Sequence, residues 1–353
     1  MADAPITHGG NLHEAALRYG IPRDAWLDLS TGINPHGFPV PPVPADAWRR
    51  LPEDDGVLAA HAARYYRAPG AAHVLPVAGS QAAIRALPAL FARGTVGVAP
   101  LAYSEYAPAF ARHGHSGAPL DCGADTLPAA LTYAIVANPN NPTAERIDRT
   151  RLLRWHAQLV ARGGALIVDE AFADAESAAH ASLAADTHRD GLVVLRSVGK
   201  FFGLAGVRAG FALAAPALLA LLARLRDALG AWTVSGPARH AVLAAFADAA
   251  WQHAMRERLA HDGARLAALL RAHGFVTHAT PLFSWSADPR AHALHDALAA
   301  RGIWTRYFAH APSVRIGLPA GDDDWRRLER TLAECVPTLA AAAAHPSEST
   351  TRD

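Results

Sequence analysis

The feature that most constrains this fold is a series of short apolar runs separated by helical patterns. The runs are rich in β-branched residues and span Thr95–Ala99, Tyr133–Ala137, Ala165–Val168 and Leu192–Leu195. Between two of them, residues 151–162 show apolar positions at helical spacing. Continuous apolar strands that alternate with helices are typical of a mostly parallel sheet covered on both faces. The sequence therefore predicts an α/β fold.

The chain changes character after Ser235-Gly236-Pro237. A long amphipathic stretch follows to about His273, which we expect to form more than one helix. Beyond it, short strand-like and helical segments follow one another: 275–280, 283–287, 291–301, 305–308, 313–317 and 323–339. This pattern predicts a smaller α+β domain. We expect an N-terminal arm over 1–45 that is ordered and built of turns rather than a helix bundle, a large domain over 46–235, a small domain over 236–340 and a disordered tail over 341–353.

Composition excludes several classes of function. With 33 basic and 32 acidic residues the formal charge is +1, which gives no reason to expect nucleic acid or an anionic membrane as a partner. No apolar stretch reaches membrane-spanning length, and the N-terminus lacks the pattern of a signal peptide. The 19 histidines and two cysteines, Cys122 and Cys335, lack metal-ligand spacing, so no metal is expected. These observations predict a soluble, cytoplasmic protein.

Two motifs stand where a bound anion or an aromatic ligand would meet the sheet. Gly79-Ser80-Gln81 follows an apolar run and opens a predicted helix to about Arg93, where free backbone N–H groups suit a phosphate. Asn138–Thr143 holds three asparagines and two prolines at the end of a predicted strand, the edge at which ligands sit in open α/β sheets. Taken alone, the first motif is better explained as an ordinary N-cap serine. The second resembles a plain turn, but two prolines and three asparagines are more than a turn requires.

Asp169 follows a buried strand directly, where a carboxylate needs a partner. A cationic ring nitrogen would supply one, although a helix N-cap explains an isolated aspartate equally well. The segment Ser197-Val198-Gly199-Lys200 continues into a glycine-rich loop that contains Arg208. A lysine that is held near other cations and partly desolvated has a lowered pKa, as a Schiff-base amine requires. Because all four motifs occur in one chain, it is improbable that each is only a helix cap, a turn or a solvated side chain.

In this order the motifs resemble the fold type I pyridoxal-phosphate enzymes, of which aspartate aminotransferase is the reference. The resemblance covers the chain from about His8 to about Leu339. It implies that Lys200 binds the cofactor covalently and is the catalytic residue. It also implies the other cofactor contacts: Asp169 at the pyridine nitrogen, Asn141 at the ring oxygen, Tyr103 stacked on the ring, and Gly79, Ser80, Gln81, Ser197 and Arg208 around the phosphate.

Within this superfamily the arm is similar to that of threonine-phosphate decarboxylases of cobalamin biosynthesis. The likeness rests on His8-Gly9-Gly10-Asn11, on Leu27–Ser30 and on Gly32-Ile33-Asn34-Pro35, and Phe172 also fits this branch. It implies decarboxylation of L-threonine O-3-phosphate to (R)-1-amino-2-propanol O-2-phosphate. The substrate contacts that it implies are His8, Gly9, Gly32 through its backbone, Asn141, Arg306 and Arg315. It further implies a homodimer, in which Leu51-Pro52 stands where many relatives have Tyr-Pro.

Two other functions remain open on the sequence. The pair Arg306 and Arg315 is shared with histidinol-phosphate aminotransferases, so an aminotransferase acting on a phosphorylated amino acid is the alternative. The choice between the reactions depends on which bond to the α-carbon stands perpendicular to the ring, and sequence does not report that angle. A cofactor-binding regulator is a weaker alternative, because such regulators usually carry a DNA-binding domain.

Overall fold

The computed structural model describes residues 9–176 and 182–344 of the 353-residue chain. The chain forms two compact units. The larger unit spans residues 36–260, and the smaller unit joins the segment that ends at Pro35 to the segment that begins at His261.

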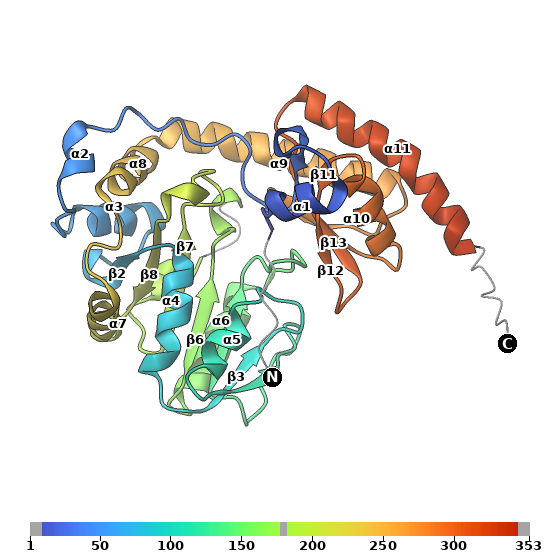
Figure 1. The fold of residues 1–353 in the computed structure, drawn as a ribbon. Coiled ribbons are helices and arrows are strands. Elements are labelled where there is room, and N and C mark those ends of the chain that lie inside the picture. The colour runs from blue at the N-terminus through green and yellow to red at the C-terminus, as the bar shows by residue number, and fades with distance from the viewer. Residues whose placement is uncertain (1–8, 177–181, 345–353) are drawn as a thin grey trace. The chain divides into compact units, whose positions relative to one another are not determined.

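A seven-stranded sheet organises the larger unit (Figure 1). Its strand order is β2-β8-β7-β6-β5-β3-β4. The neighbours from β7 to β4 pair in parallel, whereas β8 runs antiparallel to both β7 and β2. The predicted mostly parallel sheet is thus confirmed. The strands are β2 (Val74–Val77), β3 (Thr95–Val98), β4 (Ser116–Pro119), β5 (Tyr133–Ala137), β6 (Ala165–Asp169), β7 (Leu192–Ser197) and β8 (Gly210–Ala214).

Helices bury both faces of this sheet. The helices of the larger unit are α2 (Ala45–Arg49), α3 (Val57–Tyr66), α4 (Ser80–Ala86), α5 (Tyr106–Ala111), α6 (Arg149–Val160), α7 (Pro216–Leu229) and α8 (Gly236–Ala247), and α9 (Ala249–Ala272) begins in this unit. On one face, Ile84 of α4 and Phe110 of α5 share a core with alternate strand residues such as Ile135. The intervening strand residues, such as Leu166 and Val168, are also fully buried. This double coverage explains why the strands read as continuous apolar runs.

The smaller unit is built on a four-stranded antiparallel sheet of order β12-β13-β10-β9. Its strands are β9 (His278–Thr280), β10 (Phe283–Ala287), β12 (Arg306–Phe308) and β13 (Ser313–Gly317). Its helices are α1 (Leu12–Tyr19), α10 (Ala291–Ala299) and α11 (Asp322–Ala344). The N-terminal segment also adds β1 (Leu27–Asp28), which pairs in parallel with β11 (Ile303–Trp304).

Several predicted segments differ in the structure. The arm contains a helix, α1, because Asn11 caps its first turn by accepting from the Glu14 amide and Gly20 ends it in a left-handed conformation. The helix that opens at Ser80 stops at Ala86 rather than near Arg93, followed by a 3₁₀ turn that contains Pro88, which cannot continue an α-helix. Helix α11 continues to Ala344, so residues 341–344 are helical, since alanine is the best helix former. The rest of the predicted tail lies outside the described residues.

The two compact units also divide the chain differently from the predicted boundaries. Residues 9–35 of the predicted arm belong to the smaller unit, since β1 pairs with β11 and α1 packs near Ala299. Residues 236–260 belong to the larger unit, where α8 packs on α3. The change from one unit to the other therefore falls inside α9, which is continuous.

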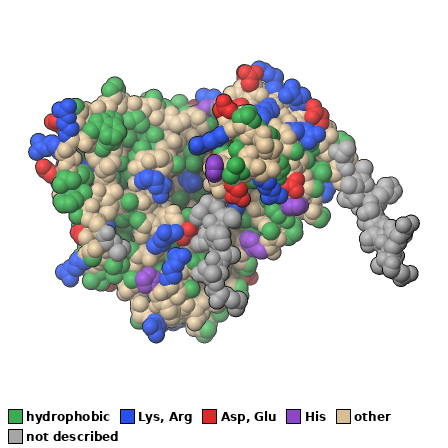
Figure 2. All heavy atoms as spheres, viewed as in Figure 1, with side chains coloured by type: hydrophobic (Ala, Val, Ile, Leu, Met, Phe, Trp, Pro, Cys, Tyr) green, Lys and Arg blue, Asp and Glu red, His purple; other side chains and the backbone are tan. Residues whose placement is uncertain are grey.

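Charges of both signs are interspersed on the face shown in Figure 2, with no field of a single sign. No helix in the described ranges is both long and apolar enough to cross a membrane.

Candidate active site

One pocket of the larger unit collects every residue that was predicted to bind the cofactor. It is lined by Gly79, Ser80, Gln81, Tyr103, Asn141, Asp169, Ser197, Lys200 and Arg208, together with Tyr106, Ala137, Ala171 and Phe172. The structure therefore places side chains from positions 79 to 208 in one cavity. Their individual roles stay predictions.

The sheet explains why these residues meet. Asp169 is the last residue of β6 and Ser197 the last of β7, and Asn141 follows β5. Because β5, β6 and β7 are parallel neighbours, their carboxyl ends lie at one edge of the sheet. Lys200 follows β7 in the turn that leads toward β8, with its ammonium 5.4 Å from the centre of the Phe172 ring.

Asp169 is a buried carboxylate held by two donors. The Tyr106 hydroxyl donates to Oδ2 at 2.8 Å, and the Ala171 amide donates to Oδ1 at 3.1 Å. Burial raises the pKa of Asp169, while these hydrogen bonds and the charge of Lys200 oppose the rise. A cation opposite this carboxylate would compensate for its burial.

Gly79 and Gly210 let other groups lie close to the backbone beside the pocket residues Ser80 and Arg208. Gly79 has a φ of 80°, and a Cβ there would lie 2.8 Å from Nη2 of Arg208. A Cβ on Gly210 would lie 2.5 Å from the amide nitrogen of Ser80. The Ser197 hydroxyl accepts from the Gly199 amide at 3.2 Å. Together with Ser80 and Ser197, this cradle offers the hydroxyl, amide and guanidinium donors that bind a phosphate.

A buried ionic cluster supports the two strand ends. Arg196 precedes Ser197 and forms ion pairs with Glu170, the neighbour of Asp169, and with Asp174. All three side chains are almost fully buried, and the Arg196 guanidinium also lies 4.4 Å from the centre of the Tyr66 ring. Because the cluster ties the end of β7 to the residues that follow β6, it fixes where Asp169 and Ser197 stand.

Sequence reasoning missed four lining residues, of which Tyr106 is the most informative. Its ring lies 5.5 Å from that of Tyr103 in an edge-to-face contact. Burial, then the charges of Glu105 and Asp169, raise the pKa of Tyr103 to about 12, so its hydroxyl stays protonated at neutral pH. The spacing of two tyrosines three apart at the start of a helix was the available signal. Ala137, Ala171 and Phe172 adjoin predicted site residues in the chain.

The predicted substrate residues belong mainly to the smaller unit. Arg306 and Arg315 are register partners on β12 and β13, so their side chains share one face of that sheet. Arg315 donates to the carbonyl oxygen of Ser30, and a Cβ on Gly9 would lie 2.4 Å from that same oxygen. Gly32 is buried with a φ of 61°. His8 lies outside the described residues, and Asn141 lies in the cofactor pocket of the larger unit.

The two arginines make this part of the smaller unit strongly cationic. Burial, then the nearby charge of Arg306, lower the pKa of Arg315 to about 10. Burial also lowers the pKa of Arg306. Because burial and the charge of Arg306 both destabilise the protonated form of Arg315, a bound anion beside Arg315 would be favourable. No cluster of side chains suited to a metal ion occurs among residues 9–176 and 182–344.

Comparisons with known proteins place these observations in a family. A family model described as aminotransferase class I and II matches residues 57–327. The chain is 49% identical to threonine-phosphate decarboxylase of Pseudomonas aeruginosa, covering 93% of this chain and 97% of that protein. It is 42% identical to threonine-phosphate decarboxylase of a Sinorhizobium species, covering 94% and 98%.

Similarity to an aminotransferase is weaker and shorter. Histidinol-phosphate aminotransferase 2 of Burkholderia mallei is 29% identical and covers 62% of each chain. Among solved structures, histidinol-phosphate aminotransferase of Sinorhizobium meliloti in complex with pyridoxal-5'-phosphate superposes with a TM-score of 0.78 at 18% identity, covering 96% of each chain. At that identity, the structural likeness supports the fold alone.

Proposed function

This chain belongs to the family of class I and class II aminotransferases, and we propose that it uses pyridoxal phosphate to decarboxylate L-threonine O-3-phosphate. The observation that carries the proposal is its identity of 49% and 42% with two threonine-phosphate decarboxylases over nearly their whole length. The aminotransferase alternative rests on 29% identity over 62% of the chain. The product would be carbon dioxide and 1-amino-2-propanol O-2-phosphate.

The pocket fits the cofactor by the chemistry of its donors. Its buried carboxylate, Asp169, suits a cationic ring nitrogen, and Gly79 and Gly210 let the Arg208 guanidinium and the Ser80 amide lie close to the backbone, which brings phosphate donors together. The amine comes from Lys200, which is the only lysine of the chain. No other side chain of this protein could form a Schiff base with an aldehyde.

Each pocket residue then has a task. Ser80, Ser197 and Arg208 would hold the phosphate with the backbone around Gly79 and Gln81, Tyr103 would stack on the ring, and Asn141 would donate to the ring oxygen. When bound, the cofactor supplies a protonated ring that accepts the electron pair left on the α-carbon as carbon dioxide departs. Lys200 delivers a proton to that carbon, so a C–H bond replaces the C–C bond that is lost.

The substrate's two anions match the two arginines of the smaller unit. We assign Arg315 to the carboxylate and Arg306, with His8, to the phosphate. A guanidinium binds either anion through two parallel N–H donors, and a bound anion would offset the effect of the Arg306 charge on Arg315. Gly9 and Gly32 would approach the substrate through their backbone.

The decisive experiment measures carbon dioxide released from threonine phosphate by the purified holoenzyme. A decarboxylase releases it without an amino acceptor. A transferase instead forms glutamate in stoichiometric amounts when 2-oxoglutarate and histidinol phosphate are supplied. Glutamate formation without carbon dioxide release would replace the proposal by its alternative.

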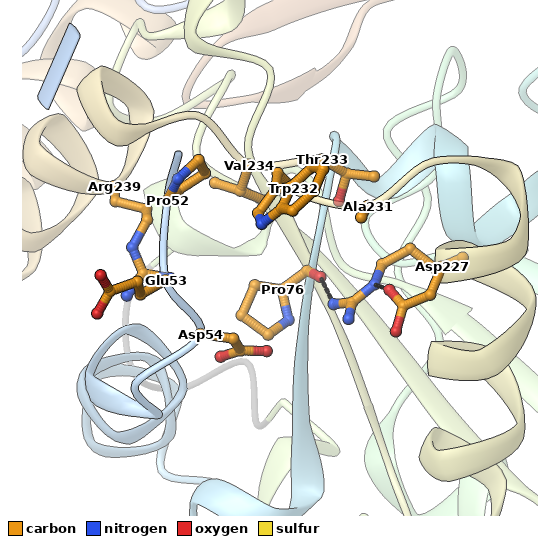
Figure 3. Close-up of a pocket in the computed structure, with 11 residues that line it drawn as sticks. Pro52, Glu53, Asp54, Pro76, Asp227, Ala231, Trp232, Thr233, Val234 and Arg239 are labelled. Carbon is orange, nitrogen blue, oxygen red and sulfur yellow. Dashed lines mark hydrogen bonds and ion pairs between the residues drawn. The ribbon is translucent and has the colours of Figure 1, made fainter. Parts of the chain in front are cut away.

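The proposal includes a homodimer, which is supported by exposed apolar side chains on the larger unit. Trp48, Leu51 and Trp232 are 68%, 63% and 60% exposed. Leu51 and Trp232 line two adjoining pockets that share Pro52 and Arg239, and Trp48 belongs to α2, which packs on α8. Figure 3 shows Trp232 beside Pro52 and Val234 on one side of the first pocket, with Asp54 and Asp227 on the other. Such side chains on one surface are typical of a protein interface.

We place the reaction in the cytoplasm. The support is that Cys122 and Cys335 are both free thiols in the structure, as in a reducing compartment. Fractionation of cells that express the chain would test this location.

A further inference from the structure

The carboxylate expected to face the cofactor ring is held by a tyrosine from a distant part of the chain. Tyr106 is the first residue of α5, and its ring is fully buried in the core that α4 and α5 form with the sheet. Its hydroxyl donates to Oδ2 of Asp169 at 2.8 Å, and both residues line the cofactor pocket. Tyr106 therefore contacts the acidic group from the side of the helix layer.

The hydroxyl acts as a fixed donor. Burial, and then the charge of Asp169, raise the pKa of Tyr106 well above its usual value of 10, so the hydroxyl keeps its proton at every working pH. With the Ala171 amide on Oδ1, each carboxylate oxygen accepts one hydrogen bond. This arrangement fixes the plane of the carboxylate and leaves each oxygen a second lone pair.

The same hydrogen bond bears on the charge of Asp169. Burial is the largest influence and raises the pKa of this carboxyl, and the neighbouring charge of Glu170 adds to the rise. The Tyr106 hydrogen bond is the largest opposing influence, ahead of the Ala171 amide and the charge of Lys200. Tyr103 also lies close enough for its own pKa to be raised by Asp169. Without Tyr106, ionised Asp169 would lose its strongest stabilising contact.

We infer that Tyr106 is a positioning residue that keeps Asp169 ionised and aimed at the pyridine nitrogen, and so sets how strongly the protein prefers a cofactor with a protonated ring. The inference rests on the proposed role of Asp169 toward the cofactor, and it does not depend on which amino acid is the substrate. Tyr106 acts through Asp169 and needs no contact with the ring.

The alternative is that Tyr106 is an ordinary core tyrosine whose hydroxyl has found the nearest acceptor. The chain offers a matched control for this alternative. Tyr133 is 3% exposed, belongs to the same core, and donates its hydroxyl to the backbone carbonyl of Ala92 at 2.8 Å. Tyr133→Phe removes the same atom from the same core without touching Asp169.

The test compares the affinity of the apoprotein for pyridoxal phosphate with its affinity for the analogue that carries C–H in place of the ring nitrogen. Wild type should prefer the natural cofactor. Tyr106→Phe should reduce this preference about ten- to a hundredfold, the range for a hydrogen bond to a charged group, while Tyr133→Phe should leave it unchanged. An equal loss of affinity for both cofactors in Tyr106→Phe would overturn the inference.

A second readout follows the proton itself. With ¹⁵N-labelled cofactor, the nitrogen chemical shift across a pH series should show the ring losing its proton at lower pH in Tyr106→Phe than in wild type or Tyr133→Phe. In an Asp169→Asn background, adding Tyr106→Phe should change the preference no further, since the two residues act as one unit. A further loss in that background would show that Tyr106 does not act through Asp169.

Folding of the variant need not limit the test. If Tyr106→Phe fails to fold, 3-fluorotyrosine at position 106 keeps the ring and makes the hydroxyl the stronger donor. The preference for the ring nitrogen should then rise, and an unchanged preference would refute the role. None of these measurements uses threonine phosphate, so failure of the proposed substrate would leave their outcome untouched.

Discussion

At the scale of the residue, the proposed function places the covalent chemistry on Lys200. Lys200→Ala should abolish both the visible absorbance band of the bound cofactor and turnover, because the chain has no second lysine to form the covalent link. Spectra before and after borohydride reduction, followed by peptide mass spectrometry, would check this. A Lys200→Ala protein that retains the band and full activity would show the assignment to be wrong.

In the proposed function, Arg306 binds the phosphate of the substrate and so sets which amino acid is accepted. If it reads the phosphate, Arg306→Ala should cost about 2–4 kcal/mol in kcat/KM with threonine phosphate, the range for truncating one partner of a buried charge pair. Activity with unphosphorylated threonine should barely change. Arg301→Ala, which removes a more exposed arginine of the same unit, is the control. An equal loss on both substrates would show that Arg306 does not recognise the phosphate.

Residue identities at the site could be predicted where a motif is contiguous in sequence, as around Lys200 and Asn141. The hydrogen bond from Tyr106 to Asp169 could not be predicted, because it joins positions 63 residues apart. That contact exists only once α5 packs against the sheet. The buried pairing of Arg196 with Glu170 and Asp174 was missed for the same reason.

At the scale of the element, α10 contains a buried histidine that makes stability depend on pH. His295 accepts or donates a hydrogen bond at 2.8 Å with the Thr305 hydroxyl, and burial lowers its pKa to about 4. Asp296 opposes this shift, while Arg18, His292 and Arg306 add to it. The folded state therefore keeps His295 neutral over a range in which the unfolded chain is protonated.

The sign follows from proton uptake. Between about pH 6.5 and pH 4 the unfolded state binds more protons at His295, so stability falls as pH falls through this window and is unaffected by this group above it. At pH 5 the loss should be about 2 kcal/mol relative to pH 7.5. Urea unfolding of wild type and His295→Asn at both pH values measures it, and an identical pH dependence in the two proteins would contradict the prediction.

Elements were predictable where burial on two faces left continuous β-branched runs, as in β5, β6 and β7. Strand β8 was missed because Gly210-Phe211-Ala212-Leu213-Ala214 has no β-branched residue. Its strand conformation comes from pairing with β7 and β2, which lie on either side of it. Helix α4 ends earlier than the apolar pattern predicts, because Pro88 in the following 3₁₀ turn cannot continue an α-helix.

At the scale of the whole molecule, we expect the exposed surface around Trp232 to form the interface of the proposed homodimer. Trp232→Glu would place a charge in an apolar contact and shift the protein from dimer to monomer at micromolar concentration. Val276→Glu, at an apolar residue that is 73% exposed on the smaller unit, should leave the dimer intact. Analytical ultracentrifugation decides between them, and a wild-type protein that is a fully active monomer would refute the dimer.

The division of the chain was the least predictable feature at this scale. Glycine and proline at 236 and 237 indicated a boundary, yet Ser235 caps α8 there and the larger unit continues to residue 260. Likewise, the strand β1 joins the N-terminal segment to residues near 303, a pairing between distant segments that no local pattern reports.

The single lysine gives this protein an unusual chemical signature. Apart from the terminal amino group, the chain has one primary amine, that of Lys200, and it lies in the pocket. The other 32 strongly basic side chains are arginines. Amine-directed reagents therefore have one side-chain target, and its protection reports occupancy of the pocket without any enzymatic assay. The same fact means that enzymes which acylate or conjugate lysine side chains can act only on Lys200, so under the proposed role of Lys200 any such modification would also inactivate the protein.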